Sequence, residues 1–333
     1  MPRRDASSLR RGLLSLLALA LALAGVWTFG GLRDDQAPVP VDLSRRIEIH
    51  PQEKSGEITY AYLPQYSHRV SLERQRQLVE YLSRAVGLRI RQVFPGTFDE
   101  HIKLVGQGMI DISFANPFVY VKLSRLYGAR AVARIVEPGD PGSGAQAGPD
   151  SPGASFRGQI IVRADNAEIR SLDDCKGKRW IAVDPTSAGG YLYALGLFHD
   201  HGINPADFAE IAFAPGPGGK QEKVVMSVLA GQYDFGAIRE GALDVITGST
   251  RIKDIRVLAS TPRYPGWVFS VRKGLDPAVA AKVRDALLAL DPENPEQARI
   301  LEKAGIVRII AAGDADFDPV RELIAKIGPN AIW

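Results

Sequence analysis

The spacing of apolar residues in the first half of the chain predicts strands that alternate with helices. Strands are expected at 58–63, 88–93 and 110–114, with a helix at 72–86. Strands separated by helices in this order form βαβαβ units, and such units build parallel sheets. The first half of the chain is therefore expected to fold around a parallel sheet.

Two helix starts in this half carry sequence signals. Thr97 with Glu100 forms a capping box, in which side chains satisfy free backbone N–H groups at a helix start. Asn116 followed by Pro117 is typical of another start, because proline suits the first helical turn. Helices are therefore expected to follow the second and third strands directly.

The second half repeats the alternation. In both halves a glycine ends a helix and an aspartate three residues later opens a strand, at Gly108 and Asp111 and again at Gly231 and Asp234. The elements expected here are strands at 159–163, 180–183, 211–214, 234–238 and 268–271, and helices at 191–200, 221–230, 277–290, 295–304 and 318–327.

This order predicts an α/β protein with two lobes, each a mainly parallel sheet flanked by helices. The first lobe is expected to comprise 56–160 with 265–333 and the second 161–264, joined by hinge strands. The stretch 138–155 is rich in Gly, Pro and Ser, which predicts a flexible surface loop. Ligands of open parallel sheets bind at the carboxyl ends of the strands, so the cleft between the lobes is the expected site.

Residues 1–31 have the pattern of an export signal. Four arginines precede an apolar run at 13–29, as in a signal peptide, although the run is also nearly long enough to remain as a membrane anchor. A periplasmic location is expected in either case. Cys175 is the only cysteine, which excludes an intrachain disulfide and leaves no cysteine for lipid attachment.

The formal net charge of +3 comes from this leader. Removing its four arginines and Asp5 from the 41 basic and 38 acidic residues leaves 37 of each. A neutral remainder argues against nucleic acid or an anionic membrane surface as the partner.

The segment 184–191, DPTSAGGY, is the strongest candidate for chemistry. It joins a predicted strand to a predicted helix and places the hydroxyls of Thr186 and Ser187 beside the backbone amides of residues 188–190. Free N–H groups at a helix start with hydroxyl donors bind an anion without a countercharge. The alternative is a glycine-rich turn in which a hydroxyl caps the helix.

The glycine-rich stretch before Gln221 is similar to a phosphate-binding P-loop but departs from it. Ala214 stands where the first glycine belongs, and Gln221 replaces the hydroxyl residue that would hold magnesium. Lys220 is left at a helix start, either solvated or beside an anion. His199 and His201 do not share a helix face, and no metal ligand cluster or catalytic motif is recognised.

Three segments together resemble a known family. DISFANPFVYV at 111–121, SLDDCKGKRWIAVDPTSAGGY at 171–191 and GQYDFGAIREGAL at 231–243 are similar to the phosphonate, phosphite and phosphate substrate-binding proteins of ABC importers. The resemblance covers 56–328 and implies the type II periplasmic-binding fold. It also implies that the loop at 187–189 holds the oxyanion.

Several positions depart from the pattern of that family. Phe98 and Ala115 replace aromatic hydroxyls, Gln221 replaces a histidine, and Trp267 replaces an acidic residue, whereas Glu240 remains acidic. Each lost hydroxyl removes a donor from the oxyanion at a cost of about 1–3 kcal/mol. The resemblance therefore implies weakened binding of simple phosphonates or a redirected site.

The expected ligand site combines polar and aromatic side chains. The aromatic residues suit a ligand with an apolar or planar part, or else they belong to the core. Lys220 and Arg239 can meet a negative group. The full set is Gln65, Tyr66, Phe98, Asn116, Thr186, Ser187, Ala188, Gly189, Gly190, Tyr191, Lys220, Gln221, Arg239, Glu240 and Trp267.

These residues predict a monomeric binding protein that closes its lobes on a small oxyanion and delivers it to an inner-membrane ABC permease. No cofactor, metal or catalysis is expected. One alternative is a membrane-anchored sensor that reports ligand occupancy to a signalling partner. The other is an exported enzyme acting on a phosphorus ester, which requires a base near Thr186 or Ser187.

Overall fold

The computed structural model describes residues 56–138, 152–246 and 252–328. The expected leader at 1–31 and most of the expected loop at 138–155 lie outside these ranges. Within them, no helix combines the length and the apolar character needed to cross a membrane.

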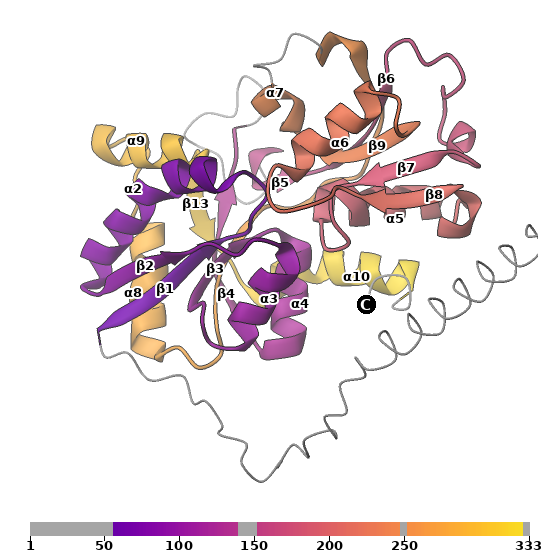
Figure 1. The fold of residues 1–333 in the computed structure, drawn as a ribbon. Coiled ribbons are helices and arrows are strands. Elements are labelled where there is room, and N and C mark those ends of the chain that lie inside the picture. The colour runs from indigo at the N-terminus through magenta and orange to yellow at the C-terminus, as the bar shows by residue number, and fades with distance from the viewer. Residues whose placement is uncertain (1–55, 139–151, 247–251, 329–333) are drawn as a thin grey trace, which may run out of the picture. The chain divides into compact units, whose positions relative to one another are not determined.

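The first sheet has six strands, in the order β13-β4-β12-β3-β1-β2 (Figure 1). The helices that accompany it form where the apolar spacing predicted them, although the first begins four residues early because Ser67 caps it. The elements are β1 (Glu57–Tyr62), α2 (His68–Val86), β2 (Arg89–Val93), α3 (Phe98–Gly106), β3 (Ile112–Ala115), α4 (Pro117–Tyr127), β4 (Arg130–Val136), β12 (Val268–Val271), α8 (Pro277–Leu288), α9 (Pro295–Ala304) and β13 (Arg308–Ala311).

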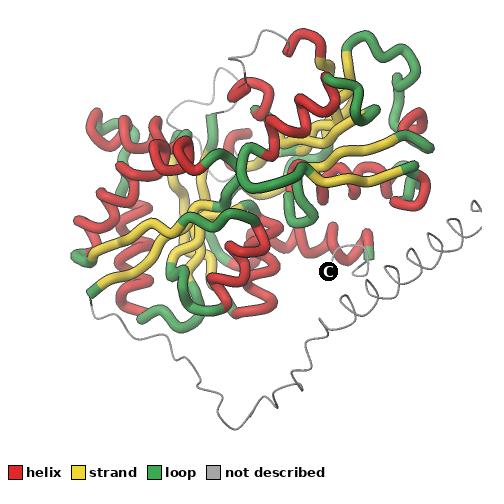
Figure 2. Tube along the Cα trace, viewed as in Figure 1, coloured by secondary structure: helices red, strands yellow, loops and turns green. Residues whose placement is uncertain are grey.

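The second sheet has five strands, in the order β10-β6-β9-β7-β8. Figure 2 shows its strands as a group separate from those of the first sheet, with helices on their flanks. Its elements are β6 (Gly158–Arg163), β7 (Arg179–Ala182), α5 (Tyr193–Asp200), β8 (Glu210–Phe213), α6 (Lys220–Leu229), β9 (Phe235–Arg239), α7 (Ala242–Ile246) and β10 (Ile255–Ser260).

Both sheets combine parallel and antiparallel pairs. β1 is parallel to β2 and β3, and β7 is parallel to β8 and β9. β12 is antiparallel to β3 and β4, β13 to β4, and β6 to β9 and β10. The two-lobed α/β architecture is confirmed, but the sheets are less parallel than predicted. Part of the difference arises because β4, β10 and β13 were not predicted, and the last two are antiparallel to their neighbours. The rest arises because two predicted strands, β12 and β6, run antiparallel to β3 and β9.

Short strands pair where the chain passes between the two sheets. β5 (Ser155–Phe156) is antiparallel to β11 (Tyr264–Pro265), and a 3-10 turn at Pro152–Ala154 precedes β5. Ala154 is fully buried, and its carbonyl oxygen accepts hydrogen bonds from Arg134 and Gly266. The prediction of a flexible surface loop is therefore wrong for residues 152–155, because these small residues pack closely against β4.

The last helix, α10 (Asp318–Ile327), lies against elements of both sheets. It contacts α4, which accompanies the first sheet, and α5, which accompanies the second. A Cβ on Gly196 would come within 2.4 Å of Leu323, so α5 and α10 approach closely only because this residue is glycine. Lys326 also pairs with Asp200. The prediction assigned all residues after 265 to the first lobe, whereas α10 is shared.

An aromatic cluster holds the second sheet to its helix. The rings of Trp180, Phe198, Phe208 and Phe235 lie 4.9–5.8 Å apart between centroids, and Trp180, Phe198 and Phe235 are fully buried. Aromatic pairs at this spacing add stability beyond the area that they bury. Because Trp180 lies on β7 and Phe198 on α5, the cluster fixes the helix that begins at the candidate site.

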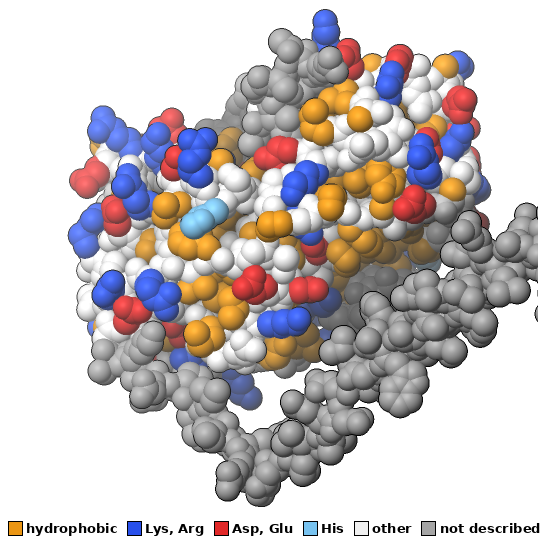
Figure 3. All heavy atoms as spheres, viewed as in Figure 1, with side chains coloured by type: hydrophobic (Ala, Val, Ile, Leu, Met, Phe, Trp, Pro, Cys, Tyr) orange, Lys and Arg blue, Asp and Glu red, His pale blue; other side chains and the backbone are white. Residues whose placement is uncertain are grey.

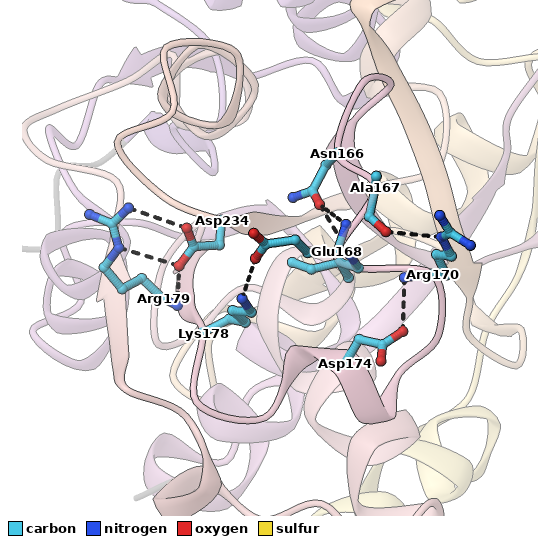
Figure 4. Close-up of polar contacts among 9 residues, drawn as sticks. Asn166, Ala167, Glu168, Arg170, Asp174, Lys178, Arg179 and Asp234 are labelled. Atoms are coloured by element: carbon cyan, nitrogen blue, oxygen red, sulfur yellow. Dashed lines mark hydrogen bonds and ion pairs between the residues drawn. The ribbon is translucent and has the colours of Figure 1, made fainter.

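The two aspartates that open strands perform the same task in each sheet. Asp111 accepts hydrogen bonds from the backbone N–H of Thr59, at 2.8 Å, and from its hydroxyl, and pairs with Arg272 at 2.6 Å. Asp234 accepts from the backbone N–H of Arg179 at 2.7 Å and pairs with that arginine (Figure 4). Each carboxylate thus ties the start of its own strand to the start of a neighbouring strand.

Replacing Asp111 by alanine is expected to lower the free energy of unfolding by about 2–4 kcal/mol. The substitution leaves the buried Thr59 N–H and one arginine without their acceptor. The matched control is Asp234→Ala, which should cost only about 1 kcal/mol because the Asp234 side chain is 31% exposed. Urea unfolding measures both, and an equal loss in the two variants would contradict this assignment.

Candidate functional site

One carboxylate organises the turn that follows β7. Asp184 accepts hydrogen bonds through Oδ1 from the Thr186 backbone N–H, at 3.0 Å, and from the Thr186 hydroxyl, at 2.8 Å. Its Oδ2 lies 2.5 Å from Nζ of Lys220, the first residue of α6. All three residues are buried. The ion pair explains a lysine at a helix start, where an unpaired cation would oppose the helix dipole.

The turn continues into a π-helical segment at Ala188–Leu192, which leads into α5. Ser187 is its N-cap, and the Ser187 hydroxyl oxygen accepts from the Gly190 N–H at 3.1 Å. The Leu192 N–H bonds the carbonyl of Ser187, five residues earlier. Among the described residues, nothing accepts from the N–H groups of Ala188 and Gly189. Such wide turns leave extra N–H groups free and are frequent at functional sites.

Two glycines bring this turn against β6 and β9 of the second sheet and against β5, which connects the sheets. A Cβ on Gly158 would lie 2.5 Å from the carbonyl oxygen of Gly189, and a Cβ on Gly189 would lie 3.0 Å from Phe156 and from Arg239. Any side chain at either position would push the turn away from β5 and β9. The glycines therefore hold the free amides next to the segment between the sheets.

A cavity lies between the turn and the first sheet's loops. About 230 Å³ of it is not filled by atoms, and only about 10 Å³ is open to the centre of a water molecule. The residues that line it are Gln65, Phe98, Asn116, Phe156, Ser187, Ala188, Gly189, Gln221, Arg239 and Trp267.

Arg239 is the cation that lines the cavity. Its guanidinium lies 2.5 Å from Glu137 and faces the rings of Phe156, at 5.4 Å, and Trp267, at 6.0 Å. Burial lowers the pKa of Arg239, but the Glu137 carboxylate, together with Tyr66 and Tyr62, raises it by more, so the net pKa lies above the usual value. Its Nε–H has no acceptor among the described residues. Arg239 therefore remains charged and keeps one donor unused.

Trp267 provides a second unused donor. Its side chain is 3% exposed, and its Nε1–H has no acceptor in the described part of the chain. The ring packs against Tyr62 and Phe114 at 5.4 and 5.5 Å. A buried N–H without a partner is costly, so its position in the lining of a cavity points to a ligand as its partner.

Nine of the ten lining residues belong to the set that the sequence suggested. The exception is Phe156, which directly follows the stretch 138–155 that was predicted to be a surface loop. An apolar residue that follows a run of Gly, Pro and Ser was the only signal for it. Its importance depends on the pairing of β5 with β11, which the sequence pattern does not reveal.

Three other suggested residues support the turn without lining the cavity. Thr186 directs its hydroxyl to Asp184, and Gly190 donates its N–H to Ser187. Lys220 is buried, pairs with Asp184 and faces the ring of Phe98 at 5.8 Å. The interpretation of Lys220 as solvated is wrong, because the buried Asp184 carboxylate is its partner.

The remaining three suggested residues lie elsewhere. Tyr66 stacks near Tyr62 and under the guanidinium of Arg74 at 5.2 Å. Tyr191 belongs to the second core, with its ring 5.5 Å from that of Trp180. Glu240 forms ion pairs with Arg157 at 3.2 Å and with Arg263 at 3.0 Å, next to the short strands β5 and β11.

The two sheets' loops touch each other across the cavity. Asn116 donates from Nδ2 to the carbonyl oxygen of Thr186 at 3.3 Å. A Cβ on Gly218 would lie 3.0 Å from the carbonyl oxygen of Tyr66. Lys223 stabilises the loop that contains Gly218. Its ammonium donates hydrogen bonds to the carbonyl oxygens of Pro215, Pro217 and Gly218 at 2.8–3.1 Å. The cavity is thus enclosed by contacts from both sides.

The described residues contain no cluster of His, Cys, Asp and Glu that could hold a metal ion. His201 bonds the carbonyl of Leu197 in its own helix. Burial raises the pKa of the Cys175 thiol to about 12, so this cysteine stays protonated at neutral pH.

A family model described as the periplasmic substrate-binding protein of phosphonate ABC transporters matches residues 60–317. The phosphate-import protein PhnD of Mycolicibacterium smegmatis is 24% identical over 296 residues, which cover 84% of each chain. The structure of PhnD1 from Prochlorococcus marinus with methylphosphonate is 15% identical and has a TM-score of 0.68, covering 82% of this chain and 98% of that one.

A relative of another class matches a shorter region. The tetrathionate sensor histidine kinase TtrS of Salmonella typhimurium is 26% identical over 194 residues. These cover 55% of this chain but only 31% of the kinase. The similarity therefore concerns a part of that larger protein.

Replacing Asp184 by asparagine is expected to lower the free energy of unfolding by about 3–5 kcal/mol, because it leaves the buried Lys220 without a counter-charge. The double variant Asp184→Asn with Lys220→Met should recover most of that loss, since both charges are then absent. Urea unfolding of the single and double variants measures this coupling. Additive losses would show that the two groups do not depend on each other.

Proposed function

This chain belongs to the family of periplasmic phosphonate substrate-binding proteins of ABC transporters, and from that premise we propose that its cavity binds a small phosphorus oxyanion. The family assignment makes the chain the substrate-binding component of an importer, located in the periplasm. The proposed ligand class is that of phosphonate, phosphite and phosphate. PhnD1 in complex with methylphosphonate and the phosphate-import protein PhnD provide the precedents.

The convergence of donors on one cavity carries the proposal. The Ser187 hydroxyl and the free N–H groups of Ala188 and Gly189 come from one turn. Arg239 adds a donor from the end of β9, and Trp267 adds one from the segment between β11 and β12. No lining residue is acidic. Hydrogen bonds to a charged ligand are worth about 1.5–3 kcal/mol each, so this set suits an oxyanion.

Binding is proposed to require motion of the lobes. The free space in the cavity, about 10 Å³, is about enough for one water molecule. An oxyanion is larger, so it enters only if the enclosing contacts open or side chains move. We place the hinge at the paired strands β5 and β11, where the chain passes between the sheets. The closed form would then present the surface that an inner-membrane permease recognises.

The proposed role does not include catalysis. Family members are binding proteins, and in the described part of the chain the only carboxylate that bonds a hydroxyl of the turn is Asp184. The Thr186 hydroxyl bonds Asp184, but it does not line the cavity and Asp184 is already paired with Lys220. Turnover of a phosphonate ester by the purified chain would contradict this part of the proposal.

A sensor is the second candidate, favoured by the similarity to the tetrathionate sensor kinase of Salmonella typhimurium. In that case the apolar segment at 13–29 would remain as an anchor, and occupancy would be reported to a signalling partner. Cleavage of the leader favours the importer role, and retention favours the sensor. The intact mass of the protein isolated from cell envelopes distinguishes the two.

We also propose that the chain acts as a monomer and does not bind nucleic acid. On the face in Figure 3, acidic and basic side chains are interspersed, without a large region of one sign. The balance of 37 basic and 37 acidic residues beyond the leader agrees with this distribution.

Replacing Ser187 by alanine is expected to weaken methylphosphonate binding about tenfold or more, because one donor to a charged group is lost. Isothermal titration calorimetry measures the dissociation constant. The matched control is Ser171→Ala. The Ser171 hydroxyl bonds Asp174 at an exposed position away from the cavity, so its removal should leave binding unchanged. Unchanged binding in the Ser187 variant would reject the position of the site.

A further inference from the structure

The aromatic rings that line the cavity already face cations of the protein. The guanidinium of Arg239 lies 5.4 Å from the ring centre of Phe156 and 6.0 Å from that of Trp267. The ammonium of Lys220 lies 5.8 Å from the ring centre of Phe98. Aromatic faces attract cations at such distances, and here the protein's own cations use that attraction. A cationic group of a ligand that approached these rings would therefore come close to Arg239 or Lys220.

The carboxylates beside these two cations are paired with them. Glu137 lies 2.5 Å from Arg239, and Asp184 lies 2.5 Å from Lys220. Neither carboxylate lines the cavity, and the described lining contains no acidic residue. Glu240, the residue after Arg239, pairs with two other arginines. A ligand ammonium in the cavity would thus meet no carboxylate that could balance its charge.

Neutral acceptors in the lining do not replace such a charge. The side-chain oxygen of Gln65 has no donor among the described residues, and the side-chain oxygens of Asn116 and Gln221 each accept one hydrogen bond. These oxygens accept equally well from a hydroxyl and from an ammonium. An ammonium, however, must give up its hydration and place its charge near Arg239 and Lys220. Hydrogen bonding admits both groups, and only charge distinguishes them.

We propose that the site selects oxyanions whose remaining part is uncharged, such as alkylphosphonates, and rejects zwitterions such as aminoalkylphosphonates. This rests on the proposed function and specifies the substrate class of the same cavity. The oxyanion lies at the Ser187 turn beside Arg239, and the rest of the ligand contacts the rings of Phe98, Phe156 and Trp267. An apolar group gains free energy by burial against such rings, whereas an ammonium loses its water without a counter-charge.

Ethylphosphonate and aminomethylphosphonate test this selectivity, because they have nearly the same shape and end in a methyl group or an ammonium. In isothermal titration calorimetry of the purified chain, the association constant of ethylphosphonate should be about tenfold or more above that of aminomethylphosphonate. An ammonium also makes the neighbouring phosphonate more acidic. The titration is therefore done at about pH 9, where both phosphonates are largely dianions and the amine keeps its proton.

Methylphosphonate is the reference ligand in the same titrations. Equal or reversed affinities of the two larger ligands, or binding of methylphosphonate alone, would overturn the selectivity and leave the proposed function intact. Binding of none of the three ligands would overturn both.

A carboxylate placed in the lining should shift the selectivity toward the zwitterion. Gln65→Glu adds a negative charge with little change of shape, so the ratio of aminomethylphosphonate to ethylphosphonate affinity should rise about tenfold or more, even if both affinities fall. The matched control is Gln65→Met, which removes the same amide without adding a charge and should leave the ratio unchanged. An equal rise in both variants, or no rise in Gln65→Glu, would mean that the charge of the lining does not determine selectivity.

Discussion

The candidate site depends on one buried carboxylate. Asp184 bonds the backbone and the hydroxyl of Thr186 and pairs with Lys220, so it joins the end of β7, the following turn and the start of α6. Because its oxygens are occupied by these three donors, it does not repel an anion in the cavity as a free carboxylate would. The turn that it fixes presents Ser187 and two free amides, and Gly158 and Gly189 allow that turn to lie against the strands between the sheets.

Two kinds of strand thus contribute to one cavity. The parallel strands provide helix starts, as expected for an α/β fold, whereas Phe156 lies on the short strand β5 and Trp267 follows the short strand β11. Any rotation of the sheets about these crossings would change the distances between the anion-binding turn, Arg239 and Trp267 together. Lobe motion and ligand contact are therefore coupled by geometry, and the contact of Asn116 with Thr186 adds to the enclosed form.

The sequence predicted the turn well because its chemistry is local. The DPTSAGGY segment follows an apolar strand and precedes a helical pattern, and nine of the ten cavity residues were suggested by this logic and by the family resemblance. What failed depends on contacts distant in sequence. The partner of Lys220 is Asp184, 36 residues away, and the place of Phe156 follows from β5 pairing with β11. The same reason explains why β4, β10 and β13 were missed, since each is defined by the strand that it joins. The Thr186 hydroxyl is the exception, because it bonds Asp184 only two residues away.

The most direct test of this account follows the backbone amides themselves. In a ¹⁵N-labelled sample titrated with a small oxyanion, the amide protons of Ala188 and Gly189 should move downfield, because they become donors to a negative charge. The indole proton of Trp267 should move in the same titration. If these signals stay in place while amides around another surface hollow, such as the one lined by Arg163 and Asp165, shift instead, the anion does not bind at this turn and the account is contradicted.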